Sequence, residues 1–107
     1  MLPLNTNLTK ISDLTTDQLE NAVGMLKAIS HPIRLSILSF LENGKELSVT
    51  EIRDLLNIEQ STTSHHLGIL KDKGVLSSKR YGKNTYYYLR HKSLDKMVEC
   101  ICNCSIS

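Results

Sequence analysis

The side chains best suited to hydrogen bonding with another molecule gather near the start of segment 58–74, IEQSTTSHHLGILKDKG. An ordinary solvated helix face carries Glu and Lys instead, because Ser and Thr are mediocre helix formers. A helix that approaches base edges in a DNA major groove needs small donors and acceptors without negative charge. A turn that only caps itself is the alternative interpretation. The candidate DNA-reading residues are Gln60, Ser61, Thr62, Ser64 and His65.

A second group of residues with chemical potential is the cysteine cluster Cys100, Cys102 and Cys104. Three cysteines within the last eight residues do not make a disulfide framework. In a cytosolic chain this spacing suggests binding of a soft metal ion or arsenite, or a response to oxidants. In a helix, Cys100 and Cys104 lie on one face and Cys102 points away; in an extended tail all three lie on one side. Thiols that do nothing are the alternative.

The remaining polar residues do not form a catalytic set. The sequence has no Ser/His/Asp combination, glycine-rich phosphate loop or paired-acid motif, so we expect no enzymatic activity. His65 and His66 are adjacent and point about 100° apart on a helix, which disfavours a shared metal ion. His66 is expected in a partly buried polar contact. His31, which precedes Pro32, is expected to cap a helix.

Composition is that of a soluble protein, with 40% apolar and 22% charged residues. A length of 107 residues corresponds to one domain with a modest core, which a partner subunit would extend. No apolar run approaches membrane-spanning length, and the N-terminus, MLPLNTNLTK, has no long apolar stretch. We therefore expect a cytoplasmic protein without a membrane partner.

The net charge of +2 hides an asymmetry along the chain. Residues 1–60 hold five Lys or Arg and eight Asp or Glu, whereas residues 71–92 hold seven Lys or Arg and one acid. The positive excess begins where the polar-faced segment ends, which favours a surface that meets phosphates. A solvated hairpin that happens to be basic is the alternative.

Helix signals surround the polar-faced segment. Residues 1–13 are polar and aperiodic, and we expect a flexible arm. A capping box at Thr15 and Gln18 predicts a helix over 14–30. Pro32 suits the first turn of a second helix, which is expected to be central to the core and to end at 43–44.

A third helix is predicted from a second capping box, Ser48 with Glu51, and gives way near Asn57. The segment 58–74 then carries an apolar stripe with helical spacing, Thr63, Leu67 and Leu70, and Gly74 can end it. Two short helices joined by a few residues, the second with small polar side chains at its start, predict a helix-turn-helix.

Beyond Gly74 the period changes to that of strands. Residues 75–79 and 85–90 are rich in Val, Thr and Tyr, and the sequence RYGKN between them suits a turn. Tyr87 and Leu89 share one face of the second strand, and the tyrosines are expected to pack within the hairpin. The basic residues of this expected wing are Lys79, Arg80 and Lys83.

A final helix is predicted over 93–104, since apolar residues recur with helical spacing after Ser93. One interpretation folds this helix onto its own domain; we favour a subunit interface formed with the helix at 14–30. The expected interface residues are Leu19, Val23, Leu94, Met97, Val98 and Ile101. The predicted fold is mainly α with a small β-hairpin: a dimeric winged helix-turn-helix over 14–104, with about five helices and a two-stranded wing.

Four segments together resemble the ArsR/SmtB family of winged-helix repressors: LKAISHPIRLSILSFL, ELSVTEIRDLL, QSTTSHHLGILKDKGVL and SSKRYGKNTYYYL. The resemblance implies a homodimer whose terminal helices pair, bound to a palindromic DNA operator and released by an effector. It implies phosphate or minor-groove contacts for Arg80 and Lys83. The groove-reading residues that it implies are Gln60, Ser61, Ser64 and His65.

The chain departs from the family at the residues that bind metal. The family's arsenic and cadmium sensors carry Cys-x-Cys where this sequence has Ser48 and Thr50, so that site is absent. The last helix offers His91, Asp95 and Glu99 without a second His, so the zinc and nickel site is not carried over.

The predicted function is therefore a sequence-specific transcriptional repressor that binds double-stranded DNA as a homodimer. No cofactor is certain, and a soft metal or arsenite at the cysteines is the candidate effector. The alternatives are a winged-helix module that binds an acidic protein, and a DNA-binding regulator without an effector.

Overall fold

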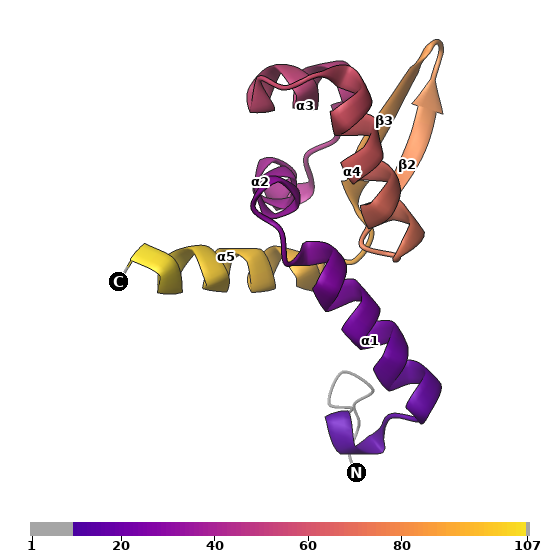
Figure 1. Cartoon of the computed structure of the whole chain (residues 1–107), viewed down its shortest axis with the longest axis vertical. Coiled ribbons are helices and arrows are strands. Elements are labelled where there is room, and N and C mark those ends of the chain that lie inside the picture. Colours follow the sequence, from indigo (N-terminus) through magenta and orange to yellow (C-terminus); the bar gives the residue numbers. More distant parts are fainter. Residues whose placement is uncertain (1–9, 107) are drawn as a thin grey trace.

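The computed structural model describes residues 10–106. The helices and strands in chain order are η2 Ile11–Asp13, α1 Thr16–Ile29, α2 Pro32–Phe40, η3 Glu42–Gly44, β1 Leu47–Ser48, α3 Val49–Leu56, α4 Gln60–Asp72, β2 Leu76–Tyr81, β3 Asn84–Leu89 and α5 Ser93–Ile106. Helices α2, α3 and α4 and the β2–β3 hairpin form the body, from which α1 and α5 project in different directions (Figure 1). The winged helix-turn-helix prediction is confirmed.

Helix starts follow the predicted capping boxes. Thr15 Oγ1 accepts a hydrogen bond from the Gln18 amide at 3.2 Å, and the Gln18 side chain accepts from the Thr15 amide at 2.9 Å. The same reciprocal pair forms between Ser48 and Glu51, at 3.1 and 2.9 Å. His31 caps α2 as expected, since its Nδ1 accepts from the Ile33 amide at 3.1 Å. Each pair satisfies amides that the first helical turn leaves without a partner.

The wing contains one strand more than the sequence suggested. Strands β2 and β3 pair from Leu76 with Leu89 to Tyr81 with Asn84. The two-residue strand β1 joins β3 on its other side, so the sheet order is β1-β3-β2. The prediction of a two-stranded sheet missed β1 because two residues are too short to show a strand period. Tyr81 and Tyr86 pack within the hairpin as expected, with ring centres 5.7 Å apart. Tyr87 and Leu89 pack against the core.

The core lies between α2, α3, α4 and the base of the hairpin, and Ile37, Leu38, Ile52, Leu67 and Leu70 are fully buried in it. Helix α2 is central, as predicted. Burying each such side chain stabilises the fold by about 1.5–3 kcal/mol. None of the helices in the part of the chain that the structure describes is long and apolar enough to cross a membrane.

The last helix requires a correction. Leu94 and Val98 were expected to face a partner subunit, but they pack into the core of their own domain, and Val98 has no exposed surface. An amphipathic stripe shows that a helix covers an apolar surface but not which surface it covers. The alternative interpretation, a helix folded onto its own domain, is right for these two residues. Ile101 remains exposed and Met97 lies at the edge of the core.

Candidate nucleic-acid interface

Helix α4 exposes the predicted polar residues together. One face is held inward, where Thr63, Leu67 and Leu70 are buried and Thr63 Oγ1 donates to the Glu59 carbonyl at 3.0 Å. Burial of that stripe turns the other face of the first turns toward solvent. The side chains exposed there are Gln60, Ser61, Thr62, Ser64 and His65. This face offers hydroxyl, amide and imidazole groups and carries no acid.

The turn before α4 fixes the direction in which this face points. Asn57 ends α3 in the left-handed conformation, with φ 56° and ψ 47°, and its amide donates to the Arg53 carbonyl at 2.8 Å. Asn tolerates this conformation better than most residues, so the sharp turn costs little. Glu59 then starts α4 from extended backbone.

Arg53 is a residue that sequence reasoning missed. Its Nη1 donates to the Gln60 side-chain oxygen at 3.2 Å across the helix-turn-helix, and its Nη2 pairs with Asp54 at 2.9 Å. This contact orients the Gln60 amide at the start of the polar face. It also places a guanidinium beside that face, where a phosphate could approach. The contact depends on the fold, so no sequence signal could have found it.

The basic residues of the wing differ in whether their charge has a partner within the domain. Arg80 and Lys83 are exposed at the hairpin tip. Lys79 instead pairs with Glu46, and its Nζ lies 5.2 Å from the centre of the Tyr88 ring and 5.5 Å from that of Tyr81. The hydrogen bond with Glu46 raises the pKa of Lys79. Lys79 therefore has a local partner for its charge, which makes it the weakest of the three phosphate candidates.

A cluster of two histidines and an arginine, His66, His31 and Arg34, lies behind the polar face. His66 is 8% exposed, its ring lies 4.9 Å from that of His31, and its Nδ1 accepts from Arg34 Nη1 at 3.3 Å. Burial, and then the neighbouring His31, Arg34 and His65, lower the pKa of His66 from its ordinary value of 6.5. The expectation of a partly buried polar contact for His66 is confirmed.

The His66 cluster predicts an acid-sensitive fold. The pKa of His66 is lower in the folded chain than in the unfolded chain. The unfolded chain therefore binds more protons than the folded chain as the pH falls below 6.5. The free energy of unfolding should therefore fall from about pH 7.5 to about pH 5.5, and His66→Gln should flatten part of this decline. Urea unfolding at both pH values, with the exposed His91→Gln as control, measures it. A decline of the same size in the His66→Gln variant would contradict the assignment.

Comparison with known proteins supports the same architecture. The model of the family "Bacterial regulatory protein, arsR family" matches residues 31–78. The transcriptional repressor PagR of Bacillus anthracis is 35% identical over 83 residues, which are 78% of this chain and 83% of PagR. The chain belongs to the ArsR family. It is a transcriptional regulator with a winged helix-turn-helix fold.

Two solved structures and a further relative are also similar to this chain. The crystal structure of PagR has a TM-score of 0.73 and covers 81% of this chain and 99% of that one, at 33% identity. HlyU from Vibrio cholerae has a TM-score of 0.77 at 29% identity, covering 87% and 100% of the two chains. CadC of Listeria innocua, a cadmium resistance regulatory protein, is 36% identical over 76 residues, 71% of this chain and 64% of CadC.

The cysteines of this ArsR-family chain lie on a helix that continues past them. All three are exposed, and Sγ of Cys100 lies 4.0 Å from Sγ of Cys104. Hydrogen bonding with Cys104 raises the pKa of the Cys100 thiol, which lowers its thiolate fraction at neutral pH. Within residues 10–106 no three His, Cys, Asp or Glu side chains converge on a possible metal position. The fold thus brings together two of the three predicted thiols.

An apolar strip runs along the outside of α1. Leu19, Val23 and Leu26 recur at helical spacing and are 38%, 47% and 57% exposed. Leu26 was not among the interface residues expected from the sequence. Its exposure is what adds it to the strip. Large apolar side chains exposed in a row on one helix indicate a surface that another element covers.

Proposed function

We propose that this chain is a homodimeric repressor that binds a palindromic DNA operator, with α4 of each protomer in a major groove. The observation that carries the proposal is the exposed, acid-free face at the start of α4. Ser64 and His65 belong to this face, and their hydroxyl and imidazole groups can donate to or accept from base edges. Membership of the ArsR family and the similarity to the repressor PagR support repression over activation.

The wing completes the proposed interface. Arg80, near the end of β2, and Lys83, in the turn that follows, supply positive charge. The hairpin that carries them projects from the helices (Figure 1). Such residues contact phosphates or the minor groove and fix the orientation of the protein without reading sequence. Lys79 is expected to contribute less to phosphate binding, because Glu46 offsets its charge.

The proposed dimer uses the strip on α1, Leu19, Val23 and Leu26, together with the exposed part of α5 around Met97 and Ile101. The chain is extended for its length, which supports a partner: the radius of gyration is 15.3 Å, whereas a compact domain of this length has about 13 Å. Two-fold symmetry of the protein would match a palindromic operator.

A salt titration tests DNA binding directly. Arg80→Ala or Lys83→Ala should weaken binding to all DNA sequences. Each should also make the plot of log affinity against log salt shallower, by about one unit for every phosphate in each half-site that the variant no longer neutralises. Lys96→Ala on α5 is the matched control and should leave the slope unchanged. A shallow slope in the wild type would instead favour the module that binds an acidic protein.

For the effector, the proposal is a thiol-reactive signal at Cys100 and Cys104. Oxidation to a disulfide, or binding of a soft ion by both thiolates, would change the helix that carries them. Helix α5 is coupled to the body: the Asp95 carboxylate accepts from the Asn43 amide at 3.2 Å, and Leu94 and Val98 lie in the core. A change in α5 can therefore reach the helix-turn-helix, which is the two-state element an effector must bias.

We expect Cys100 and Cys104, but not Cys102, to carry the response to thiol-reactive agents. Arsenite, zinc, peroxide or polysulfide should lower operator affinity of the wild type by roughly 5–150-fold. The Cys100→Ser/Cys104→Ser double variant should lose the response to the active agent, whereas Cys102→Ser should keep it. Operator titration by fluorescence anisotropy measures this. If the variant with all three cysteines replaced by serine still responded, the thiols would not be the sensing groups.

A further inference from the structure

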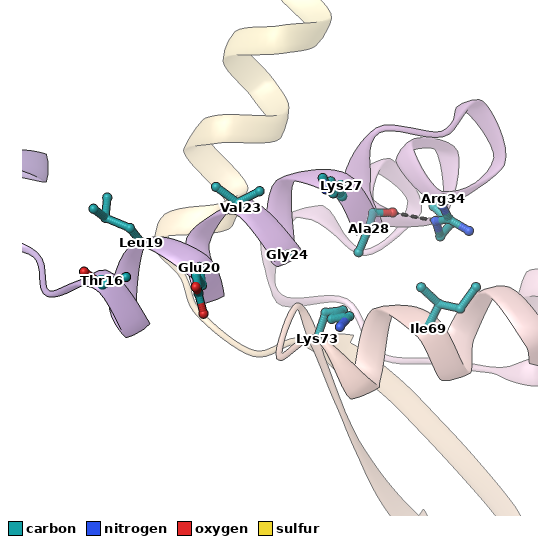
Figure 2. Close-up of a pocket in the computed structure, with 10 residues that line it drawn as sticks. All are labelled: Thr16, Leu19, Glu20, Val23, Gly24, Lys27, Ala28, Arg34, Ile69 and Lys73. Atoms are coloured by element: carbon teal, nitrogen blue, oxygen red, sulfur yellow. Dashed lines mark hydrogen bonds between the residues drawn. The ribbon is translucent and has the colours of Figure 1, made fainter.

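A groove lies between α1 and α4, on the side of the domain where Ile69 and Lys73 point from α4 toward α1 (Figure 2). Its volume is about 640 Å³. Small-molecule sites typically have about 300–1,000 Å³ and a mostly apolar lining with a few charged groups. The groove is therefore of the size that accepts a ligand of modest length.

The lining combines apolar and positively charged side chains. Ala28 and Ile69 form the inner part, and Leu19 and Val23 lie toward the outer rim. Among the charged lining residues, Lys27, Arg34 and Lys73 outnumber the single acid, Glu20. A ligand that satisfies both features has an apolar chain and an anionic head group, because the guanidinium and ammonium groups bind carboxylates well.

Arg34 connects this groove to the reading helix. Its Nε donates to the Ala28 carbonyl near the end of α1, and its Nη1 donates to His66 Nδ1 on α4 at 3.3 Å. His66 directly follows His65, a residue of the proposed reading face. An anion that draws Arg34 toward the groove would weaken these two contacts and alter how α4 is held between α1 and α2.

We propose that the α1–α4 groove binds a small amphipathic anion, a carboxylate with a medium-length apolar chain, and that this ligand changes operator affinity through Arg34. The effect on the operator rests on the proposed function; binding in the groove does not. Leu19 and Val23 also belong to the α1 strip, so the groove opens onto the proposed dimer interface. The bound chain would lie at the edge of that interface.

The experiment follows binding on the DNA-free protein by NMR, with decanoate below its micelle concentration as the probe. Decanoate should produce saturable shifts at the Ile69 methyl and the Ala28 amide. Lys73→Glu should weaken its affinity by at least about tenfold, since an attractive charge becomes a repulsive one. Lys96→Glu on α5 is the matched control and should bind as the wild type does. Decyltrimethylammonium, with the same chain and a cationic head, should bind at least about tenfold more weakly.

Three results would overturn binding of the anion in the groove. The first is equal affinity for the two probes, which would mean unspecific apolar binding. The second is shifts confined to residues outside the groove. The third is a set of intersubunit NOEs from Ile69 without ligand, which would mean that a second copy of the chain fills the groove. If decanoate binds at Ile69 but leaves operator affinity unchanged, the coupling through Arg34 is wrong. If the wild-type protein bound no DNA, the proposed function would be wrong. Binding of decanoate in the groove would still be tested by the NMR titration.

Discussion

Alanine at Ser64 or His65 is expected to weaken binding to the operator by about 1–3 kcal/mol and to leave binding to unrelated DNA almost unchanged. Both side chains are exposed in the first two turns of α4, outside the stripe that is buried at Thr63 and Leu67. A side chain that reads a base edge contributes only where the correct base is present. Contacts with phosphates, in contrast, are made on every sequence.

The measurement is fluorescence anisotropy with the operator and with a scrambled duplex of the same length, at one salt concentration. Ser30→Ala is the matched control, since Ser30 is an exposed serine at the end of α1. It should bind both duplexes as the wild type does. Equal losses on both duplexes for Ser64→Ala and His65→Ala would show that α4 is not the reader.

Aspartate at Leu26 is expected to convert the dimer into monomers. Leu26 is the most exposed member of the α1 strip, and a carboxylate placed in an apolar interface without a partner is strongly unfavourable. A monomer engages one half-site at a time, so operator affinity should fall by about 10²–10⁴-fold because avidity disappears.

Sedimentation at several protein concentrations measures the assembly, and Leu55→Asp is the matched control. Leu55, on α3, is 56% exposed against 57% for Leu26, so the two substitutions change surfaces of similar exposure. Leu55→Asp should remain dimeric. If Leu26→Asp also remained dimeric, the interface would lie away from the α1 strip.

Local patterns were enough to predict most of the fold and the reading face. Thr15 and Ser48 begin helices where their capping boxes predict, because these hydrogen bonds join residues only three positions apart. The polar face of α4 follows from the buried stripe of Thr63, Leu67 and Leu70 in the same way. Such features could be predicted because they follow from the spacing of residues that are close in the sequence.

Features that depend on distant contacts were missed. Strand β1 is defined only by its pairing with Tyr86 and Tyr87. The charge of Lys79 is offset by Glu46, which belongs to the segment before β1. The packing of Val98 in its own core and the contact of Arg53 with Gln60 likewise require the tertiary arrangement. In each case residue type was informative, but the partner could not be read from the chain.

Selection of bound sequences from a random pool of double-stranded DNA tests the central claim, that two copies of α4 read DNA as a symmetric pair. We expect enrichment of an inverted repeat whose half-sites lie about 10–10.5 base pairs apart, or a multiple of that, centre to centre. Substituting His65 should change the preferred base at one position of each half-site. Recovery of no common sequence, or of one without two-fold symmetry, would contradict it.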